Sequence, residues 1–165
     1  MIKNKFELIY GGGTLGLMGA VSSVFKQKEK KYTGIVPRIF SNIVNYSVDI
    51  VTEDLRERKA LMHKKSDAFI ALSGGFGTFD EIFETIAFKL LNYHNKPIVF
   101  INTNNFYSPL KDYFKKVISL GFASKESKDL YYFAKNSADA IEYILNYKAK
   151  KQTIKNDDCR NKTKN

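Results

Sequence analysis

The sequence DAFIALSGGFGTFDE, residues 67–81, decides the fold. Its first six residues are mostly apolar, which predicts a buried strand over residues 67–72. A run with three glycines follows, and a strong helix is expected over residues 78–91 because apolar residues recur there at helical spacing. A strand that passes through a glycine-rich turn into a helix is a unit of an α/β fold. The residues expected on the apolar side of the helix are Ile82, Phe83, Ile86 and Leu90.

The same alternation extends outward in both directions. Strands are expected over residues 6–10, 33–36, 97–101 and 130–133, with a short extended piece near residues 48–51. Helices are expected over residues 15–25, 53–65, 108–120 and 137–145. Ser108 is expected as the N-cap of the third of these helices, with Pro109 at its first position. The pattern predicts an α/β fold, in which helices cover both faces of a parallel sheet, as one domain over residues 1–146.

Composition excludes several classes of protein. The 165 residues are 44% hydrophobic, which suffices for one core, and no run of about 18 apolar residues predicts a membrane span. The single cysteine, Cys159, excludes an internal disulfide framework and a CxxC metal pair. His63 and His94 are far apart in the sequence, so no zinc site built from neighbouring Cys and His is expected. Residues 1–10 lack the long apolar stretch of a secretory signal.

The positive charge is concentrated at the end of the chain. The formal net charge is +10, and residues 147–165 carry half of this excess. Those residues are rich in Lys, Asn, Asp and Thr, so we expect a disordered basic tail. A solvated tail is the favoured interpretation, and nucleic-acid binding is not expected because aromatic residues do not interleave the basic ones.

A first glycine loop, GGGTLGLMG at residues 11–19, follows the strand expected over residues 6–10. Its glycines, Gly12 and Gly13 among them, allow a sharp turn, and amides at the start of the next helix favour an anion. The loop is neither a P-loop nor a GxGxxG motif with its acidic partner, so it does not indicate a dinucleotide. A tight turn without a ligand is the alternative.

The second glycine loop opens the helix expected from residue 78. It predicts a phosphate site at a helix N-terminus, also at the carboxyl end of a strand, where open parallel sheets bind ligands. A capping box, with Thr78 as N-cap and Glu81 reaching back, would explain two of its residues without a ligand. The candidate phosphate-binding residues are Gly74, Gly75, Phe76, Gly77 and Thr78.

Upstream, residues 55–62 read LRERKALM. Arg58 shares a helix face with Leu61 and Met62, which are three and four residues further on. An arginine beside an apolar face is a candidate for holding phosphate or a developing charge, whereas the alternative is a solvated charged helix.

These three segments together resemble the Lonely Guy (LOG) family of cytokinin riboside 5′-monophosphate phosphoribohydrolases. The family motif PGGxGTxxE corresponds to residues 73–81, the family's Arg-Lys stretch, roughly M-H-x-R-K-x-x-M, to residues 55–62, and GGG…GLMG to residues 11–19. The similarity covers about residues 6–145.

The resemblance implies a Rossmann-like fold, a homodimer, and hydrolysis of the N-glycosidic bond of a purine riboside monophosphate to free base and ribose 5-phosphate. A cytoplasmic location is expected separately, because a lone cysteine favours a reducing compartment. It places the catalytic pair at Arg58 and Glu81 and adds Lys59 to the substrate-binding residues. It implies no metal or redox cofactor. Family members are often labelled lysine decarboxylases, a label we set aside because neither glycine loop supplies a Schiff-base lysine.

Two departures from the family pattern are visible. Ser73 stands where the motif has proline, which makes the entry to the loop less preorganised. The family's first strand and helix are expected to be missing before residue 6, which leaves a sheet edge exposed. The alternative function is therefore a nucleotide- or phosphate-binding relative without catalytic activity.

Overall fold

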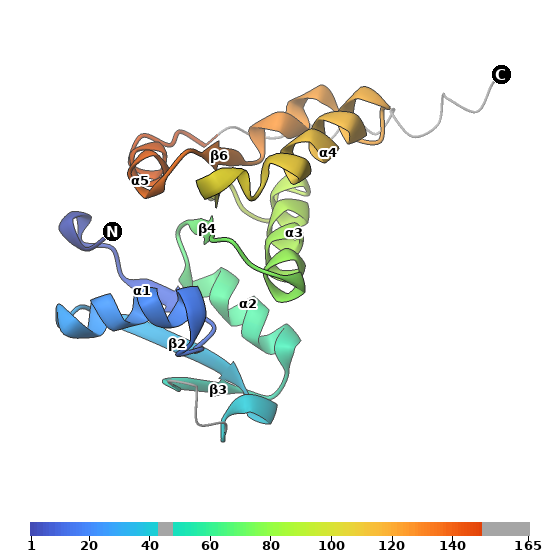
Figure 1. Ribbon diagram of the computed structural model, residues 1–165. Helices are drawn as coiled ribbons and strands as arrows, with labels where there is room; N and C mark the ends of the chain where they lie inside the picture. Colours follow the sequence, from blue (N-terminus) through green and yellow to red (C-terminus); the bar gives the residue numbers. More distant parts are fainter. Residues whose placement is uncertain (43–47, 150–165) are drawn as a thin grey trace. The chain divides into compact units, whose positions relative to one another are not determined.

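The computed structural model describes residues 1–42 and 48–149. The chain divides into two compact units, the first over residues 1–66 and the second from residue 67 onward, and each is described by itself (Figure 1). The expectation of one domain over residues 1–146 stays a prediction. Of the predicted basic tail, residues 150–165 lie outside the described residues.

The first unit contains a three-stranded parallel sheet in the order β1-β2-β3. Its strands are β1 (Leu8–Tyr10), β2 (Tyr32–Pro37) and β3 (Ile50–Thr52). Helix α1 (Gly16–Gln27) connects β1 to β2, and α2 (Leu55–Lys65) follows β3. In the register Leu8 pairs with Tyr32 and Ile35 with Ile50. Short 3₁₀ turns occupy Ile2–Asn4 and Arg38–Phe40.

The core of the first unit lies where the middle strand meets its helices. Ile35 and Val36 of β2 are completely buried, and Phe25 of α1 and Tyr10 of β1 are almost so. A middle strand of a parallel sheet is covered on both faces, which explains why consecutive residues of β2 are buried.

The second unit contains a three-stranded parallel sheet in the order β4-β5-β6. Its strands are β4 (Phe69–Ala71), β5 (Ile98–Ile101) and β6 (Tyr132–Ala134). Its helices are α3 (Phe76–Leu90), α4 (Ser108–Ser119) and α5 (Ser137–Leu145). Short 3₁₀ segments occupy Thr103–Asn105 and Lys125–Asp129.

The second unit has three layers, and alternate residues of β5 define them. Ile98 and Phe100 pack with Ile82 of α3 and Tyr107 at the start of α4. Val99 and Ile101 point to the other face and pack with Ala140 of α5. Because strand side chains alternate between faces, α3 and α4 cover one face and α5 covers the other.

The structure confirms parallel strands that alternate with helices, as the sequence predicts. The strands of the described residues form two three-stranded sheets, one in each unit, where we expected one sheet. Two local predictions are wrong. Tyr107, not Ser108, is the N-cap of α4, so Ser108 is already helical. Phe83 and Leu90 are exposed, because the buried side of α3 passes instead through Thr85 and Lys89.

Candidate functional site

Helix α2 carries Arg58, and the carboxylate of Asp54 caps its N-terminus. Oδ1 of Asp54 accepts hydrogen bonds from the backbone N–H groups of Arg56 and Glu57, both at 2.8 Å. These bonds stabilise the charged carboxylate, and the one from Glu57 is the largest cause that lowers the pKa of Asp54. The cap fixes the first turn of α2 and therefore the point from which the side chain of Arg58 extends.

The side chain of Arg58 reaches from α2 to strand β2 and to the turn directly after β1. Its Nε donates to the carbonyl oxygen of Ile35 at 2.9 Å. A Cβ atom built on Gly11 would lie 2.1 Å from Nη2 of Arg58, so the guanidinium occupies the space that the missing side chain leaves. Arg58, Leu61 and Met62 are all half-buried, as their shared helix face predicts. Lys59 is the next residue on α2, so its side chain leaves the helix about 100° away from that of Arg58.

The first glycine loop turns tightly between β1 and α1. Gly12 has a φ of 76°, a conformation that favours glycine. A Cβ atom on Gly13 would lie 2.5 Å from Cε of Met18, and one on Gly19 would lie 2.0 Å from the carbonyl oxygen of Thr14. Turn geometry and close packing thus account for these glycines, and a bound anion at this loop stays a prediction.

The second glycine loop connects β4 to α3 and ends at the N-cap of the helix. That N-cap is Gly75, which has no side chain of its own to cap the first turn. The first N–H groups of such a helix lack partners within the helix and point outward with the positive end of its dipole. Backbone donors at this loop are therefore placed to bind an oxyanion.

Thr78 lies inside α3, not at its cap. The helix begins at Phe76, so the capping box that the sequence allows is not formed with Thr78 as N-cap. A Cβ atom on Gly74 would lie 2.2 Å from Oγ1 of Thr78, which shows that the threonine side chain folds back over the loop. Phe76 is 93% exposed and Gly77 has open space where a Cβ would be, so neither is fixed by packing.

Glu81 is half-buried on the same helix, one turn beyond Thr78. Its carbonyl oxygen accepts from Oγ1 of Thr85 at 2.8 Å. Residues three apart share a helix face, so its carboxylate follows the threonine along α3. The second unit thus brings together the glycine loop, Thr78 and Glu81, whereas Arg58 and Lys59 belong to the first unit.

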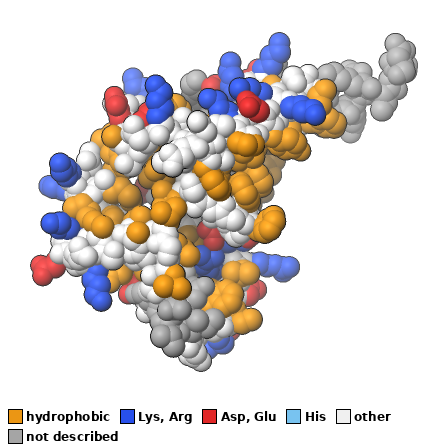
Figure 2. Space-filling model, in the orientation of Figure 1, with side chains coloured by type: hydrophobic (Ala, Val, Ile, Leu, Met, Phe, Trp, Pro, Cys, Tyr) orange, Lys and Arg blue, Asp and Glu red, His pale blue; other side chains and the backbone are white. Residues whose placement is uncertain are grey.

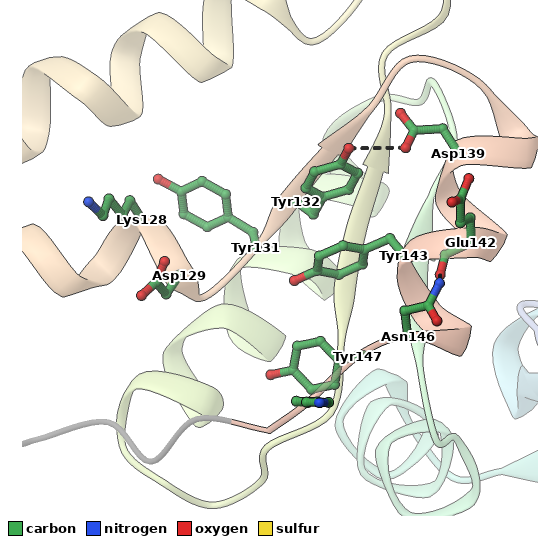
Figure 3. Close-up of a pocket in the computed structure, with 10 residues that line it drawn as sticks. Lys128, Asp129, Tyr131, Tyr132, Asp139, Glu142, Tyr143, Asn146 and Tyr147 are labelled. Atoms are coloured by element: carbon green, nitrogen blue, oxygen red, sulfur yellow. Dashed lines mark hydrogen bonds between the residues drawn. The ribbon is translucent and has the colours of Figure 1, made fainter.

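A groove of about 590 Å³ lies elsewhere in the second unit, against β6 and α5 (Figure 3). The rings of Tyr132 and Tyr143 stack with their centroids 4.2 Å apart, and the Tyr132 hydroxyl donates to Oδ1 of Asp139 at 3.0 Å. Burial, with a smaller effect of neighbouring charges, raises the pKa of Tyr143 to about 12. None of the residues that line this groove was a sequence candidate, because an aromatic pattern alone is typical of a core.

Lys89 is a second feature that the sequence did not single out. It is completely buried, its Nζ donates to the carbonyl oxygen of Leu130 at 2.9 Å, and it lies 4.8 Å from the centroid of the Tyr147 ring. Burial lowers its pKa to about 8, and the charge of Asp129 opposes this shift. The contacts show a lysine that ties α3 to the segments around β6 and α5.

Residues 1–42 and 48–149 contain no group of three or more His, Cys, Asp or Glu side chains that could hold a metal ion. No helix among them has the length and apolar character needed to cross a bilayer.

Comparison with known proteins identifies relatives over most of the chain. The family model described as "Possible lysine decarboxylase" matches residues 18–144. Cytokinin riboside 5′-monophosphate phosphoribohydrolase LOG5 of Arabidopsis thaliana is 34% identical over 90% of this chain and 67% of its own length. The probable phosphoribohydrolase LOGL2 of Oryza sativa subsp. japonica is 32% identical over 93% of this chain and 65% of its own length. The chain therefore spans about two thirds of the length of these relatives.

A bacterial relative and a solved structure extend the comparison. The cytokinin riboside 5′-monophosphate phosphoribohydrolase of Rhodococcoides fascians is 35% identical over 86% of this chain and 74% of its own length. The structure of a molybdenum cofactor binding protein from Rippkaea orientalis aligns with a TM-score of 0.61 and 26% identity, over 87% of this chain and 78% of that chain. This alignment supports a Rossmann-like fold.

Proposed function

Because the chain belongs to the LOG family, we propose that it hydrolyses the N-glycosidic bond of a purine riboside 5′-monophosphate. The base is adenine or an N6-substituted adenine, and the products are the free base and ribose 5-phosphate. The names of the curated relatives describe phosphoribohydrolases, which supports this proposal. The description of the family model names a different reaction, lysine decarboxylation.

The observation that carries the proposal is the start of α3. A glycine loop leads into a helix whose N-cap is itself a glycine, Gly75, and Glu81 lies one turn beyond Thr78 on that helix. Backbone amides at the first turn suit the 5′-phosphate, and a carboxylate at that distance suits the sugar to which the phosphate is attached.

The chemistry follows from charge. Cleavage of the C1′–N9 bond leaves positive charge on the ribose ring, as in other glycoside hydrolysis. The carboxylate of Glu81 stabilises that charge or accepts a proton from the attacking water, whose oxygen forms the new bond to C1′. The bond electrons leave with N9, which takes up a proton.

The guanidinium of Arg58 has the proposed role of holding an oxyanion. The contact of Nε with Ile35 fixes its plane, and a fixed guanidinium fork suits a phosphate or carboxylate. Lys59 has the proposed role of adding positive charge from the same helix.

The direct test is base release. The full chain is incubated with AMP and with N6-isopentenyl-AMP, and free base is measured by chromatography. Release that saturates with substrate supports the proposal, and no release at saturating substrate contradicts it. AMP binding by calorimetry without turnover would favour the alternative, a nucleotide-binding relative that lacks hydrolysis.

We also propose a homodimer. Apolar side chains are exposed along α3 and α4, and Figure 2 shows apolar side chains on this face of the molecule. Apolar side chains that form a contiguous exposed patch are typical of protein–protein interfaces. Analytical ultracentrifugation tests the proposal, and a monomer at micromolar concentration contradicts it. The exposed residues include Phe83 and Leu90 of α3, Tyr113 of α4 and Leu120 directly after α4.

A further inference from the structure

Tyr107 contacts the entry to the second glycine loop. It lies directly before α4, is 1% exposed, and its hydroxyl donates to the carbonyl oxygen of Leu72 at 2.5 Å. Leu72 follows the last residue of β4 and precedes the loop at residues 73–75. A residue far away in the sequence therefore holds the point where the loop begins.

The ring of Tyr107 is itself held on several sides. Its centroid is 5.1 Å from that of Phe100 on β5 and 6.3 Å from that of Phe79 on α3, and both pairs meet edge to face. Its backbone N–H donates to Oδ1 of Asn102 at 2.6 Å, directly after β5. Ring and backbone are thus both fixed, so the hydroxyl is delivered to one place.

The carbonyl of Leu72 needs this partner because strand pairing ends before it. The register between β4 and β5 ends with Ala71 opposite Phe100. Beyond that point the chain enters Ser73 and then Gly74 and Gly75, and the two glycines have wide conformational freedom. Serine at residue 73 leaves φ free, whereas the proline of the LOG motif fixes it.

We propose that Tyr107 is a positioning residue for this loop. Its hydroxyl fixes the peptide of Leu72 and thereby the direction of the backbone N–H groups that receive an oxyanion at the start of α3. The inference rests on the proposed function only in naming that oxyanion as the 5′-phosphate of the substrate. It makes phosphate recognition, not base recognition, depend on a tyrosine outside the motif.

The test compares two substitutions that each remove one hydroxyl. Tyr107→Phe keeps the ring and deletes the bond to Leu72. Tyr131→Phe is the matched control, since Tyr131 is half-buried and packs against the same aromatic cluster as Tyr107. Thermal unfolding of both variants measures how much the melting temperature falls when a hydroxyl is removed from this core.

Two measurements on the full chain separate positioning from stability. Backbone order parameters of Gly74, Gly75 and Gly77 from ¹⁵N relaxation should fall from about 0.85 to below about 0.6 in Tyr107→Phe, and stay unchanged in Tyr131→Phe. Calorimetry with AMP and with adenosine should show roughly tenfold weaker AMP binding in Tyr107→Phe, with adenosine binding unchanged.

Each outcome has one meaning. Unchanged order parameters in Tyr107→Phe would overturn the inference. A more mobile loop with equal loss of AMP and adenosine binding would overturn the role in phosphate recognition. If the wild-type chain binds AMP more tightly than adenosine and releases no base, the proposed reaction fails and the role of Tyr107 is supported by the same AMP and adenosine measurements.

Discussion

Arg58 donates from Nε to the carbonyl oxygen of Ile35 at 2.9 Å, so an arginine of α2 provides a partner for a backbone carbonyl of β2. A carbonyl of a buried strand residue is an expensive group to leave unpaired, and the bond fixes the plane of the guanidinium. A residue with a proposed chemical role is thus also part of the structure that supports it.

Gly11→Ala should displace this guanidinium. The new Cβ would lie 2.1 Å from Nη2 of Arg58, the far end of a side chain that can move, so the fold should survive. We expect kcat/KM for AMP to fall roughly 10–100-fold, with an unchanged far-UV circular dichroism spectrum. Arg58→Lys, which keeps the charge and loses the bond to Ile35, should lose activity similarly. A fully active Gly11→Ala variant would show that this position of the guanidinium is not required.

Glu81→Gln should abolish turnover and preserve binding. Removing an acid–base carboxylate costs about 10²–10⁴-fold in rate, because the amide neither accepts a proton nor carries charge. Base release from AMP measures the rate, and calorimetry measures binding. Glu84→Gln, one turn further along α3, is the control and should keep its activity. Undiminished base release by Glu81→Gln would remove this residue from the mechanism.

Gly74→Ala and Gly77→Ala should differ although both add one methyl group to the same loop region. At Gly74 the methyl would lie 2.2 Å from Oγ1 of Thr78, whereas at Gly77 it would enter open space. We expect Gly74→Ala to raise KM for AMP about tenfold or more, and Gly77→Ala to raise it much less. Equal effects would contradict a role for the packing of Thr78 over the loop.

Lys89 should make stability depend on pH. Its pKa of about 8 in the folded protein lies below its ordinary value of 10.5, so between these values the unfolded chain binds a proton that the folded chain has released. The stability of the wild type should therefore rise with pH through this window, relative to Lys89→Met. Urea unfolding at pH 7.0, 8.0, 9.0 and 9.5 should show a relative gain of roughly 1–2 kcal/mol.

The pH range of this stability experiment has an upper limit. Tyr107, Tyr143 and Tyr147 have pKa values raised by burial, so their ionisation destabilises the fold above a pH of about 10. Measurements therefore stop at pH 9.5. If the free energy of unfolding changes with pH in the same way for the wild type and Lys89→Met, the burial of Lys89 does not shift its pKa.

The order of strands and helices could be predicted from the sequence, because apolar runs and helical spacing report burial directly. The positions of side chains that interrupt those patterns could not be predicted. Thr78 followed by Glu81 reads as a capping box, but Gly75 ends the loop earlier and takes the cap position. Lys89 occupies a buried position that hydrophobicity assigns to Leu90, since its amine finds the carbonyl of Leu130 from 41 residues away.

The contact between Tyr107 and Leu72 was equally hidden from the sequence. It joins the end of β4 to the residue before α4, and nothing in a local pattern connects them. The two glycine loops were visible because glycine is unusual at such density, whereas the groups that hold those loops are ordinary core residues. The motifs thus indicated the candidate site but not the core residues that hold its loops in place.

Every strand pair among the described residues is parallel, and this bears on how the chain folds during synthesis. Parallel neighbours cannot begin as hairpins, so each pairing must wait until an intervening stretch has been made and closed into a loop. We therefore expect milliseconds or longer for folding, with helices leading. All three strands of the first unit precede residue 66, so that sheet can begin to assemble on the ribosome before β6 and α5 of the second unit are translated.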